Sequence, residues 1–302
     1  MGRQIPHPAD LFADGRRHLV VLAHHDDELP YAGLIARMRP HVRVVWLTNS
    51  DGIAHESDMT PDAYAKARYQ ESLDALSHLG LEEAQVNSLW HSEYALYELF
   101  AQMVRGEHPE EVPERFLTMA DEIEAEARAF KPDVVWTLAY QGGHPEHDLT
   151  HLYATRFVNR WRAETGQELP YFELPAYELI VVPLRFRPWR SAPYHAIQLT
   201  EDEWKAKDAM MDCYPTQARI IEEFRTIIGL YARLSWLRFK PFTFDDYGRR
   251  EVFAPVPEGR DYERSSHMSS RLDYPFDDYQ GTPMRFSEML APIARALGLT
   301  SG

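Results

Sequence analysis

Three short apolar runs in the first half of the chain constrain the fold more than any other feature. They cover His18–Ala23, Val42–Thr48 and Asp133–Leu138. None of them shows the polar alternation of a half-exposed strand, and continuous apolar runs of this length are typical of strands that are covered on both faces. The runs therefore predict the buried strands of a sheet that lies between layers of helices.

Helical patterns separate these runs. Residues 28–39 place apolar side chains three positions apart, and Thr60-Pro61 opens another helix that ends near Gly80. A weaker strand near Gln85–Trp90 and an amphipathic helix over 116–130 precede the third run. Strands that alternate with helices predict an α/β, Rossmann-like fold with a mostly parallel, doubly wound sheet. In such a sheet, ligands bind outside the carboxyl ends of the strands.

The second half of the chain is less regular. We expect strands over 177–182 and 194–199, a helix with a capping box from Thr200 to about Met211, a long helix over about 217–239 and a last helix near 286–297. The aromatic part of the long helix, from Phe224, is expected to pack in the core. We predict one domain over residues 1–302, with a core over about 15–200 and a C-terminal elaboration over about 200–302.

The composition of the chain limits the classes of partner that it is expected to bind. The chain has 47 acidic and 32 basic residues and a formal charge of −15, which disfavours nucleic acid. It has no apolar run of about 20 residues and no apolar segment before the first strand, so we expect neither a membrane partner nor a signal peptide. The single cysteine, Cys213, favours a cytoplasmic location. A homo-oligomer remains open.

Two clusters of histidine and carboxylate residues follow predicted strands. The first strand runs into His24-His25-Asp26-Asp27-Glu28, and the third leads to His144-Pro145-Glu146-His147, with His151 one helical turn later. Adjacent acidic groups at a strand end repel one another unless a cation is present. Imidazole and carboxylate together suit zinc or a related divalent ion. Because both clusters lie at carboxyl ends of one sheet, they predict a shared metal site.

The two clusters resemble the signature motifs of a known family. HLVVLAHHDDE is similar to the AHPDDE motif, and GGHPEHDLTH to the HPDH motif, of the LmbE-like, or PIG-L, de-N-acetylase superfamily. Weaker matches in the family's order extend the resemblance over about residues 18–255; they are Thr48–Gly52, Arg68–Glu71, Lys207–Ala209, Tyr214–Gln217 and Glu251–Phe253.

The resemblance implies a zinc-dependent amidohydrolase that removes an N-acyl group, in most members acetyl, from an amino sugar or a related polar small molecule. It implies His24, Asp27 and His147 as ligands of Zn²⁺, with Fe²⁺ as an alternative ion. It implies Asp26 as the general base and His144 as the group that stabilises the oxyanion.

Several neighbours of these residues are candidates for a role in the site. His25 stands where the family has proline and is a candidate competing ligand, while Glu146 replaces the aspartate of HPDH and is expected to orient His144 or His147. Arg68 is expected either to shape the substrate site or to pair with Glu71 or another carboxylate. Tyr140 and His151 are further candidates for contact with substrate or for support of the site. Glu28 is expected to start a helix rather than bind metal.

Other functions fit less well. The first strand is not followed by GxGxxG, which argues against dinucleotide binding, and no GxSxG elbow is present for a serine hydrolase. Two alternatives stay open. One is an amidase that acts on a thiol conjugate or another acylated natural product, and the other is a sugar-binding protein without activity.

Overall fold

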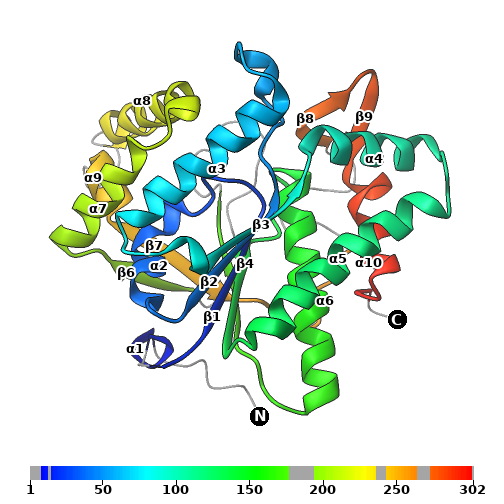
Figure 1. The fold of residues 1–302 in the computed structure, drawn as a ribbon, viewed down its shortest axis with the longest axis horizontal. Coiled ribbons are helices and arrows are strands. Elements are labelled where there is room, and N and C mark those ends of the chain that lie inside the picture. The colour runs from blue at the N-terminus through cyan, green and yellow to red at the C-terminus, as the bar shows by residue number, and fades with distance from the viewer. Residues whose placement is uncertain (1–7, 13–14, 177–193, 236–242, 264–272, 301–302) are drawn as a thin grey trace.

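The computed structural model describes residues 8–12, 15–176, 194–235, 243–263 and 273–300. Within them a seven-stranded sheet forms the centre of the molecule, in the order β3-β2-β1-β4-β5-β7-β6 (Figure 1). The strands are β1 (His18–Leu22), β2 (Val42–Thr48), β3 (Val86–His91), β4 (Val134–Leu138), β5 (Tyr171–Leu174), β6 (His195–Gln198) and β7 (Arg250–Pro255). The first five are parallel, and β7 and β6 add antiparallel pairs at one edge. The predicted α/β fold is confirmed.

Helices cover both faces of this sheet (Figure 1). One layer contains α4 (Glu93–Arg105), α5 (Glu111–Phe130), α6 (Pro145–Thr165) and α10 (Leu290–Ala296), and the other contains α2 (Ala32–Met38), α3 (Pro61–Ser77) and α7 (Glu201–Met211). Leu19 and Val21 of β1 pack in the first layer, whereas Val20 and Leu22 pack in the second. Both faces of β1 are therefore buried, which explains why its sequence is a continuous apolar run.

The C-terminal part of the described chain extends the sheet and one helix layer. Strand β6 and the Thr200 capping box of α7 confirm two predictions, whereas the strand expected over 177–182 lies outside the described residues. Helices α8 (Ala218–Ser235) and α9 (Phe244–Gly248) follow α7, and β8 (Asp273–Tyr279) with β9 (Thr282–Arg285) forms a hairpin near α4. Two short helices, α1 (Pro8–Leu11) and the 3₁₀ helix η1 (Leu29–Tyr31), flank β1 in the sequence.

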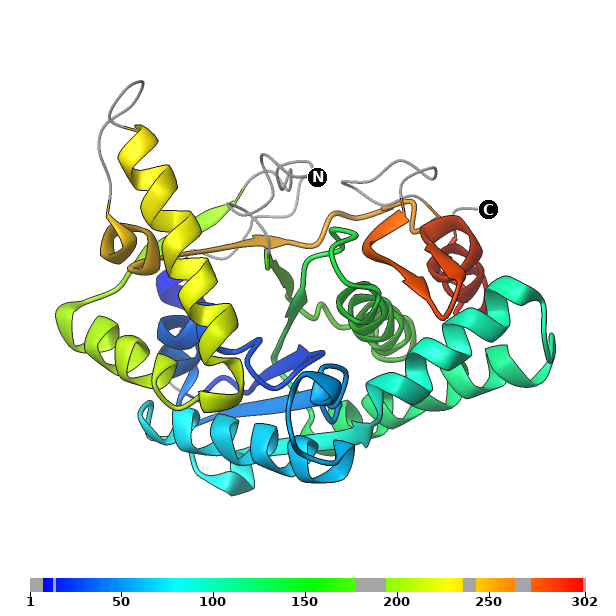
Figure 2. The same ribbon diagram turned by 90° about the horizontal axis from the view of Figure 1, so that it is seen from above.

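Helix α8 departs from the sequence-based prediction. It lies over α7 and α9 and away from the sheet (Figure 2). Ile228 is buried, whereas Ile227 and Leu230 are exposed and Phe224 is only partly buried. The expectation that this segment packs in the core is therefore confirmed for Ile228 and wrong for Ile227 and Leu230, and its later aromatic residues lie outside the described side chains. Among the helices of the described ranges, none has the length and apolar character that a bilayer crossing needs.

His18 at the start of β1 is expected to make the stability of the fold depend on pH. Its ring is buried and stacks on Phe12, and the indole N–H of Trp136 donates to its Nδ1 at 3.2 Å. Burial, reinforced by Arg16, lowers the pKa of His18 to about 4. The unfolded chain, with a pKa of about 6.5, therefore binds more protons than the folded protein between pH 6.5 and 4.

We expect the free energy of unfolding to fall by about 3 kcal/mol from this residue as the pH drops from 6.5 to 4. Urea denaturation at a series of pH values would measure this loss. In a His18→Gln variant, which keeps a polar side chain but cannot titrate, the same pH series should give a flatter profile. Parallel profiles for the two proteins would contradict the assignment.

Candidate metal centre and active site

The fold brings the two histidine–carboxylate clusters together. Strand β1 leads into the turn with His24 and Asp27, and its neighbour β4 leads to α6, for which His144 is the N-cap residue. The strand order reverses between β1 and β4, because β2 lies on one side of this pair and β5 on the other. At such a point, the connections leave in opposite directions and open a crevice at the carboxyl ends.

The three predicted metal ligands lie within reach of one ion. His147 Nε2 is 3.1 Å from both His24 Nδ1 and Asp27 Oδ1, and His24 Nδ1 is 3.5 Å from Asp27 Oδ2. Ligand atoms at zinc-bond lengths of about 2.1 Å around a tetrahedral ion are about 3.3 Å apart. The donor atoms and their spacing therefore fit a zinc ion.

The turn after β1 fixes Asp27 before any ligand binds. Its Oδ2 accepts hydrogen bonds from the backbone N–H groups of Ala23 and His24, at 3.1 and 2.7 Å. Burial favours the neutral acid, but His147 and His24 outweigh it and hold the pKa of Asp27 well below its usual range. The carboxylate is thus ionised and held in place by its own turn.

The imidazoles differ in charge. Burial lowers the pKa of His24, but the carboxylates of Glu93 and Asp27 overcome this effect and raise the pKa to about 10. For His147, burial prevails over the attraction of Asp27, and its pKa is lowered. The pocket therefore attracts one positive charge, which a proton on His24 supplies and which a divalent cation would replace.

A second group of donors shares His24. His24, His144 and Glu146 also bring one ligand atom each within 4.8 Å of one another. His144 Nδ1 is 3.7 Å from Glu146 Oε2, and the buried Glu146 carboxylate also accepts a hydrogen bond from Tyr97 at 3.4 Å. Glu146 therefore lies next to His144, and its role in orienting that ring stays a prediction.

Asp26 has an unusual backbone and a cationic partner. Its φ of 128° lies in the region that favours glycine, and its N–H donates to Glu28 Oε2 at 3.1 Å. Its carboxylate Oδ2 is 3.0 Å from Nη2 of the buried Arg68, which also donates to the carbonyl of His25. Arg68 therefore pairs with Asp26 and not with Glu71, and Glu71 instead accepts from the N–H and hydroxyl of Thr216.

Glu28 does more than begin a helix. It precedes η1, but its carboxylate is fully buried and accepts hydrogen bonds from Trp46, Ser72 and Tyr214 at 3.1, 2.6 and 2.5 Å. Burial raises its pKa. Its expected role as a charge that starts a helix is therefore incomplete, because the carboxylate is also the centre of a buried hydrogen-bond network. Glu28 joins the turn after β1 to β2, α3 and the segment after α7.

Three other candidates lie away from the cavity at this site. The His25 ring packs against Trp46 and Tyr69, with centroids 5.0 and 5.5 Å away, so its prediction as a competing ligand is wrong. The unusual φ of Asp26 turns successive side chains of this turn in different directions. Tyr140 is buried and donates to a backbone carbonyl at 2.9 Å, which rules out contact with substrate. His151 is buried too, with Nδ1 2.7 Å from the Leu138 carbonyl, and supports α6 from behind.

Glu93 is a site residue that the sequence analysis missed. It begins α4 directly after β3, and its Oε2 is 3.8 Å from His24 Nε2. Asp51 accepts hydrogen bonds from Ser92 Oγ and from the Glu93 N–H, at 2.7 and 2.8 Å, and so fixes this helix start. Burial and the nearby Glu146 raise the pKa of Glu93 to about 7, against the pull of His24. The sequence does contain a signal for Glu93: Ser92 is a typical N-cap residue, and the carboxylate that follows it lies just after the carboxyl end of β3.

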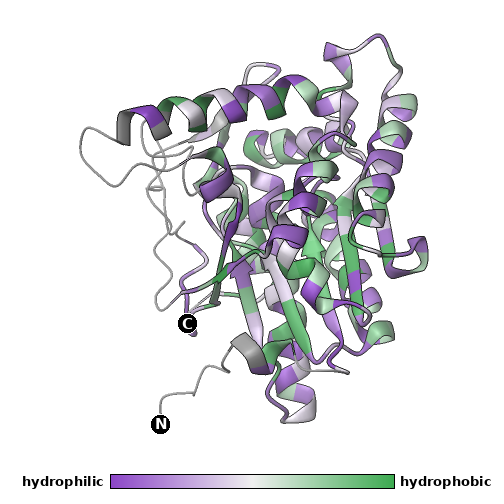
Figure 3. Ribbon diagram, turned by 90° about the vertical axis from the view of Figure 1, so that its left-hand side faces the viewer, coloured by the Kyte–Doolittle hydropathy of each residue, from purple (hydrophilic) through white to green (hydrophobic). Residues whose placement is uncertain are grey.

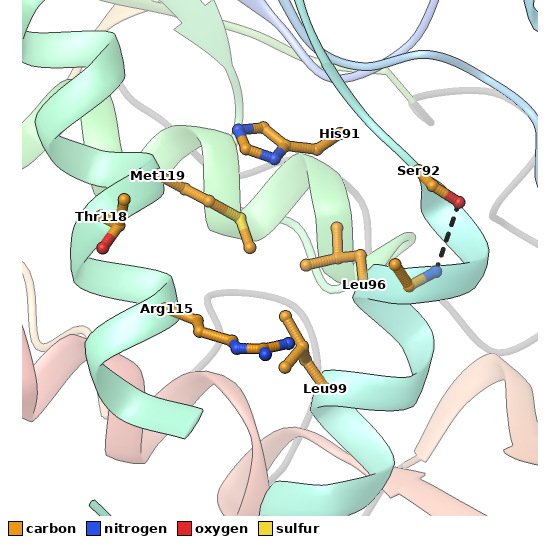
Figure 4. Close-up of a pocket in the computed structure, with 8 residues that line it drawn as sticks. His91, Ser92, Leu96, Leu99, Arg115, Thr118 and Met119 are labelled. Atoms are coloured by element: carbon orange, nitrogen blue, oxygen red, sulfur yellow. Dashed lines mark hydrogen bonds between the residues drawn. The ribbon is translucent and has the colours of Figure 1, made fainter. Parts of the chain in front are cut away.

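The cluster opens into a large cavity. It has a volume of about 830 Å³, and its lining includes the three donors of the metal centre together with Asp26, Arg68, Glu93 and His144. A smaller cavity of about 270 Å³ lies between α4 and α5 (Figure 4). Its lining includes His91 and Arg115 but no carboxylate, and it shares no residue with the larger one. Of these two cavities, the larger therefore contains the predicted metal ligands and the carboxylates.

The fold and this site define a class of protein. The model of the PIG-L family, described as GlcNAc-PI de-N-acetylase, matches residues 19–158, a range that contains both histidine–carboxylate clusters. The resemblance predicted from the motifs is thus confirmed, and the chain carries a PIG-L domain over this range. No curated protein matches the chain.

Three deacetylases are among the solved structures with a similar fold. The pseudoaglycone deacetylase Dbv21 gives a TM-score of 0.54 at 18% identity, over 81% of this chain and 98% of that chain. A deacetylase of the teicoplanin biosynthesis pathway gives 0.54 at 17% identity, over 80% and 98%. The zinc-inhibited form of the teicoplanin deacetylase Orf2 gives 0.52 at 16% identity, over 80% and 98%. At these identities the likeness establishes the fold.

The backbone of Asp26 leads to a test. A non-glycine residue at a φ of 128° is strained by about 1–3 kcal/mol. We expect an Asp26→Gly variant to be more stable to urea than Asp26→Ala by about 1–2 kcal/mol, because both lose the carboxylate but only glycine relieves the strain. At an ordinary position alanine is favoured, so an Asp26→Ala variant of equal or greater stability would exclude strain at this turn.

Proposed function

We propose that this protein is a zinc-dependent hydrolase of an N-acyl amide, in the first instance N-acetyl, on an amino sugar or a sugar-containing small molecule. One observation carries the proposal: His24, Asp27 and His147 offer donor atoms at zinc spacing in the cavity that also contains the free carboxylate edge of Asp26. The PIG-L domain and the deacetylases that share the fold support the same reaction class.

His24, Asp27 and His147 would hold the metal, with Fe²⁺ as an alternative to Zn²⁺. When bound, such an ion lowers the pKa of water and polarises a carbonyl group, which is the chemistry that amide hydrolysis requires. Glu93 beside His24 Nε2 leaves Nδ1 for the ion, in the manner of a carboxylate that orients a ligating histidine.

In this proposal Asp26 moves the proton. As general base, its carboxylate takes a proton from the attacking water and returns it to the amide nitrogen as the C–N bond breaks, so that a carboxylic acid and a free amine leave. Arg68 holds Oδ2 at 3.0 Å and fixes the orientation of the carboxylate. About a third of the Asp26 side chain is exposed to the cavity, at 32%, whereas Arg68 is buried at 4%.

In this proposal His144 stabilises the charge that develops on the acyl oxygen. It lines the cavity from the start of α6, and its Nδ1 lies 3.7 Å from the buried Glu146 carboxylate. In this role His144 would donate a hydrogen bond to the acyl oxygen. One well-placed donor of this kind contributes about 3–4 kcal/mol to stabilisation of the transition state.

The first test addresses the base. We expect Asp26→Asn to lower kcat for acetate release from N-acetylglucosamine or an N-acetylglucosaminide by about 10²–10⁴-fold, the usual contribution of general base catalysis, with zinc content unchanged. The exposed Asp62→Asn variant is the matched control. Binding of these sugars without metal-dependent acetate release by the native protein would instead favour a non-catalytic binding protein. Turnover of thiol conjugates alone would favour the amidase alternative.

The second test separates the two groups of donors. We expect Asp27→Asn and His147→Ala to weaken zinc binding by more than about 100-fold, because each removes a ligand, while Glu146→Gln has a smaller effect from outside the ligand set. Metal content after dialysis and competition with a chromogenic chelator would measure the affinities. If Glu146→Gln lost zinc and His147→Ala retained it, the ion would belong to the His24–His144–Glu146 group.

A further inference from the structure

The cavity extends well beyond the metal centre, and its far wall is apolar. Helices α7, α8 and α9 contribute Trp204, Met211, Ile221, Phe224 and Phe244 to its lining. This wall belongs to residues after 200 and so lies outside the segment 19–158 that matches the PIG-L family. An amide and a sugar ring alone give no reason for a wall of this composition.

Two charged groups in the lining on this side, Lys207 and Glu251, are already engaged with the protein. Lys207 Nζ donates to Glu251 Oε1 at 2.8 Å and to the Pro30 carbonyl at 2.5 Å. Glu251 also accepts from the N–H groups of Gly33 and Leu34, at 3.0 and 2.8 Å. These contacts hold the lysine to η1 and the glutamate to α2, so the hydrogen-bonding groups of both are used within the protein.

The wall has a fixed shape. Gly248 of α9 lies directly on the Trp204 indole, where a Cβ atom would come within 2.3 Å of the ring. Arg249 also stacks over this indole, with its guanidinium carbon 5.5 Å from the ring centroid. Because Trp204 is only 5% exposed and contacts both residues, its ring is held in place where it lines the cavity.

The apolar surface also continues from the cavity to the outside. Ile220, Phe224 and Ile227 follow at spacings of four and three residues and therefore share a face of α8. Ile220 lines the cavity although it is 40% exposed, and Ile227 is 37% exposed further along the helix. Apolar and polar residues alternate in stripes along α8 (Figure 3). Exposed apolar surface that joins a cavity is typical of a ligand-binding groove.

We propose that the substrate carries a bulky apolar group, an alkyl chain or an aromatic system, which binds between the metal centre and the wall of α7, α8 and α9. This inference rests on the proposed deacylase function and makes its substrate class more specific: an amphipathic N-acylated amino sugar. The apolar group has two sources of the same chemistry, the aglycone on the sugar or a long N-acyl chain.

Three substrates separate these sources: N-acetylglucosamine, octyl N-acetylglucosaminide and N-octanoylglucosamine. Burial of one methylene group corresponds to about a fourfold gain in binding. We expect kcat/KM for at least one of the two octyl compounds to exceed that for N-acetylglucosamine by at least tenfold. A gain for the glucosaminide places the apolar group on the aglycone, and a gain for the octanoyl amide places it on the acyl side.

Variants on one helix test the location. Phe224→Glu puts a charge in the groove, and Phe224→Ala removes apolar surface without adding charge. Both should reduce the ratio of kcat/KM between the better octyl substrate and N-acetylglucosamine to below about threefold. Leu230→Glu makes the matched change on the same helix at a residue that is 57% exposed and does not line the cavity, so the ratio should stay as in the native protein.

The outcomes distinguish the two proposals. If N-acetylglucosamine is cleaved and neither octyl compound is better, the amphipathic substrate is excluded and the deacylase function stands. If no compound is cleaved with zinc present, the deacylase function fails. Calorimetry with decyl glucoside below its micellar concentration then tests whether the groove binds an apolar group. Binding that Phe224→Glu abolishes and Leu230→Glu preserves would support the apolar site, and the absence of binding would exclude it.

Discussion

The site depends on the Asp27 carboxylate, in the turn after β1, which meets the imidazole of His147 on the helix that follows β4. Asp27 accepts two backbone N–H groups from its own turn with Oδ2 and faces His147 with Oδ1. The first contacts are local and form as soon as the turn folds. The second spans 120 residues and forms only when β1 and β4 are neighbours. A buried anion of this kind is costly unless a positive charge accompanies it. The fold thus places a buried negative charge, which a cation would stabilise, at the point where the strand order reverses.

Paired charges surround this centre. Asp26 pairs with Arg68, Glu93 with His24, and Glu146 with His144. The first two pairs join elements that are far apart in the sequence, so the tertiary structure stabilises carboxylates that would repel one another in isolation, whereas the third pair lies within the start of α6. In the proposed mechanism the carboxylates beside histidines orient the rings, while Asp26 lines the cavity.

The parts of this structure that could be predicted are those with a local signal. Continuous apolar runs identified β1, β2 and β4, and the carboxyl ends of β1 and β4 located the histidine clusters. Side-chain directions in the turns had no such signal. His25 and Tyr140 look like site residues in the sequence and are packed away in the structure, since the φ of Asp26 and the packing around Tyr140 decide where they point. Glu93 was missed because its approach to His24 depends on the cap that Asp51 gives to α4.

The C-terminal third had the weakest sequence signals, yet two buried ion pairs fasten its described part to the site. Lys207 and Glu251 hold α7 and β7 to the start of α2, the helix that follows β1. Arg260 forms a bidentate pair with Glu173 of β5, at 2.7 and 2.9 Å, and approaches His151 on α6, the helix that follows β4. Each strand that supplies metal donors is therefore followed by a helix tied to the C-terminal third. The apolar wall is consequently held at a fixed distance from the donors, as it must be if one substrate is to contact both at once.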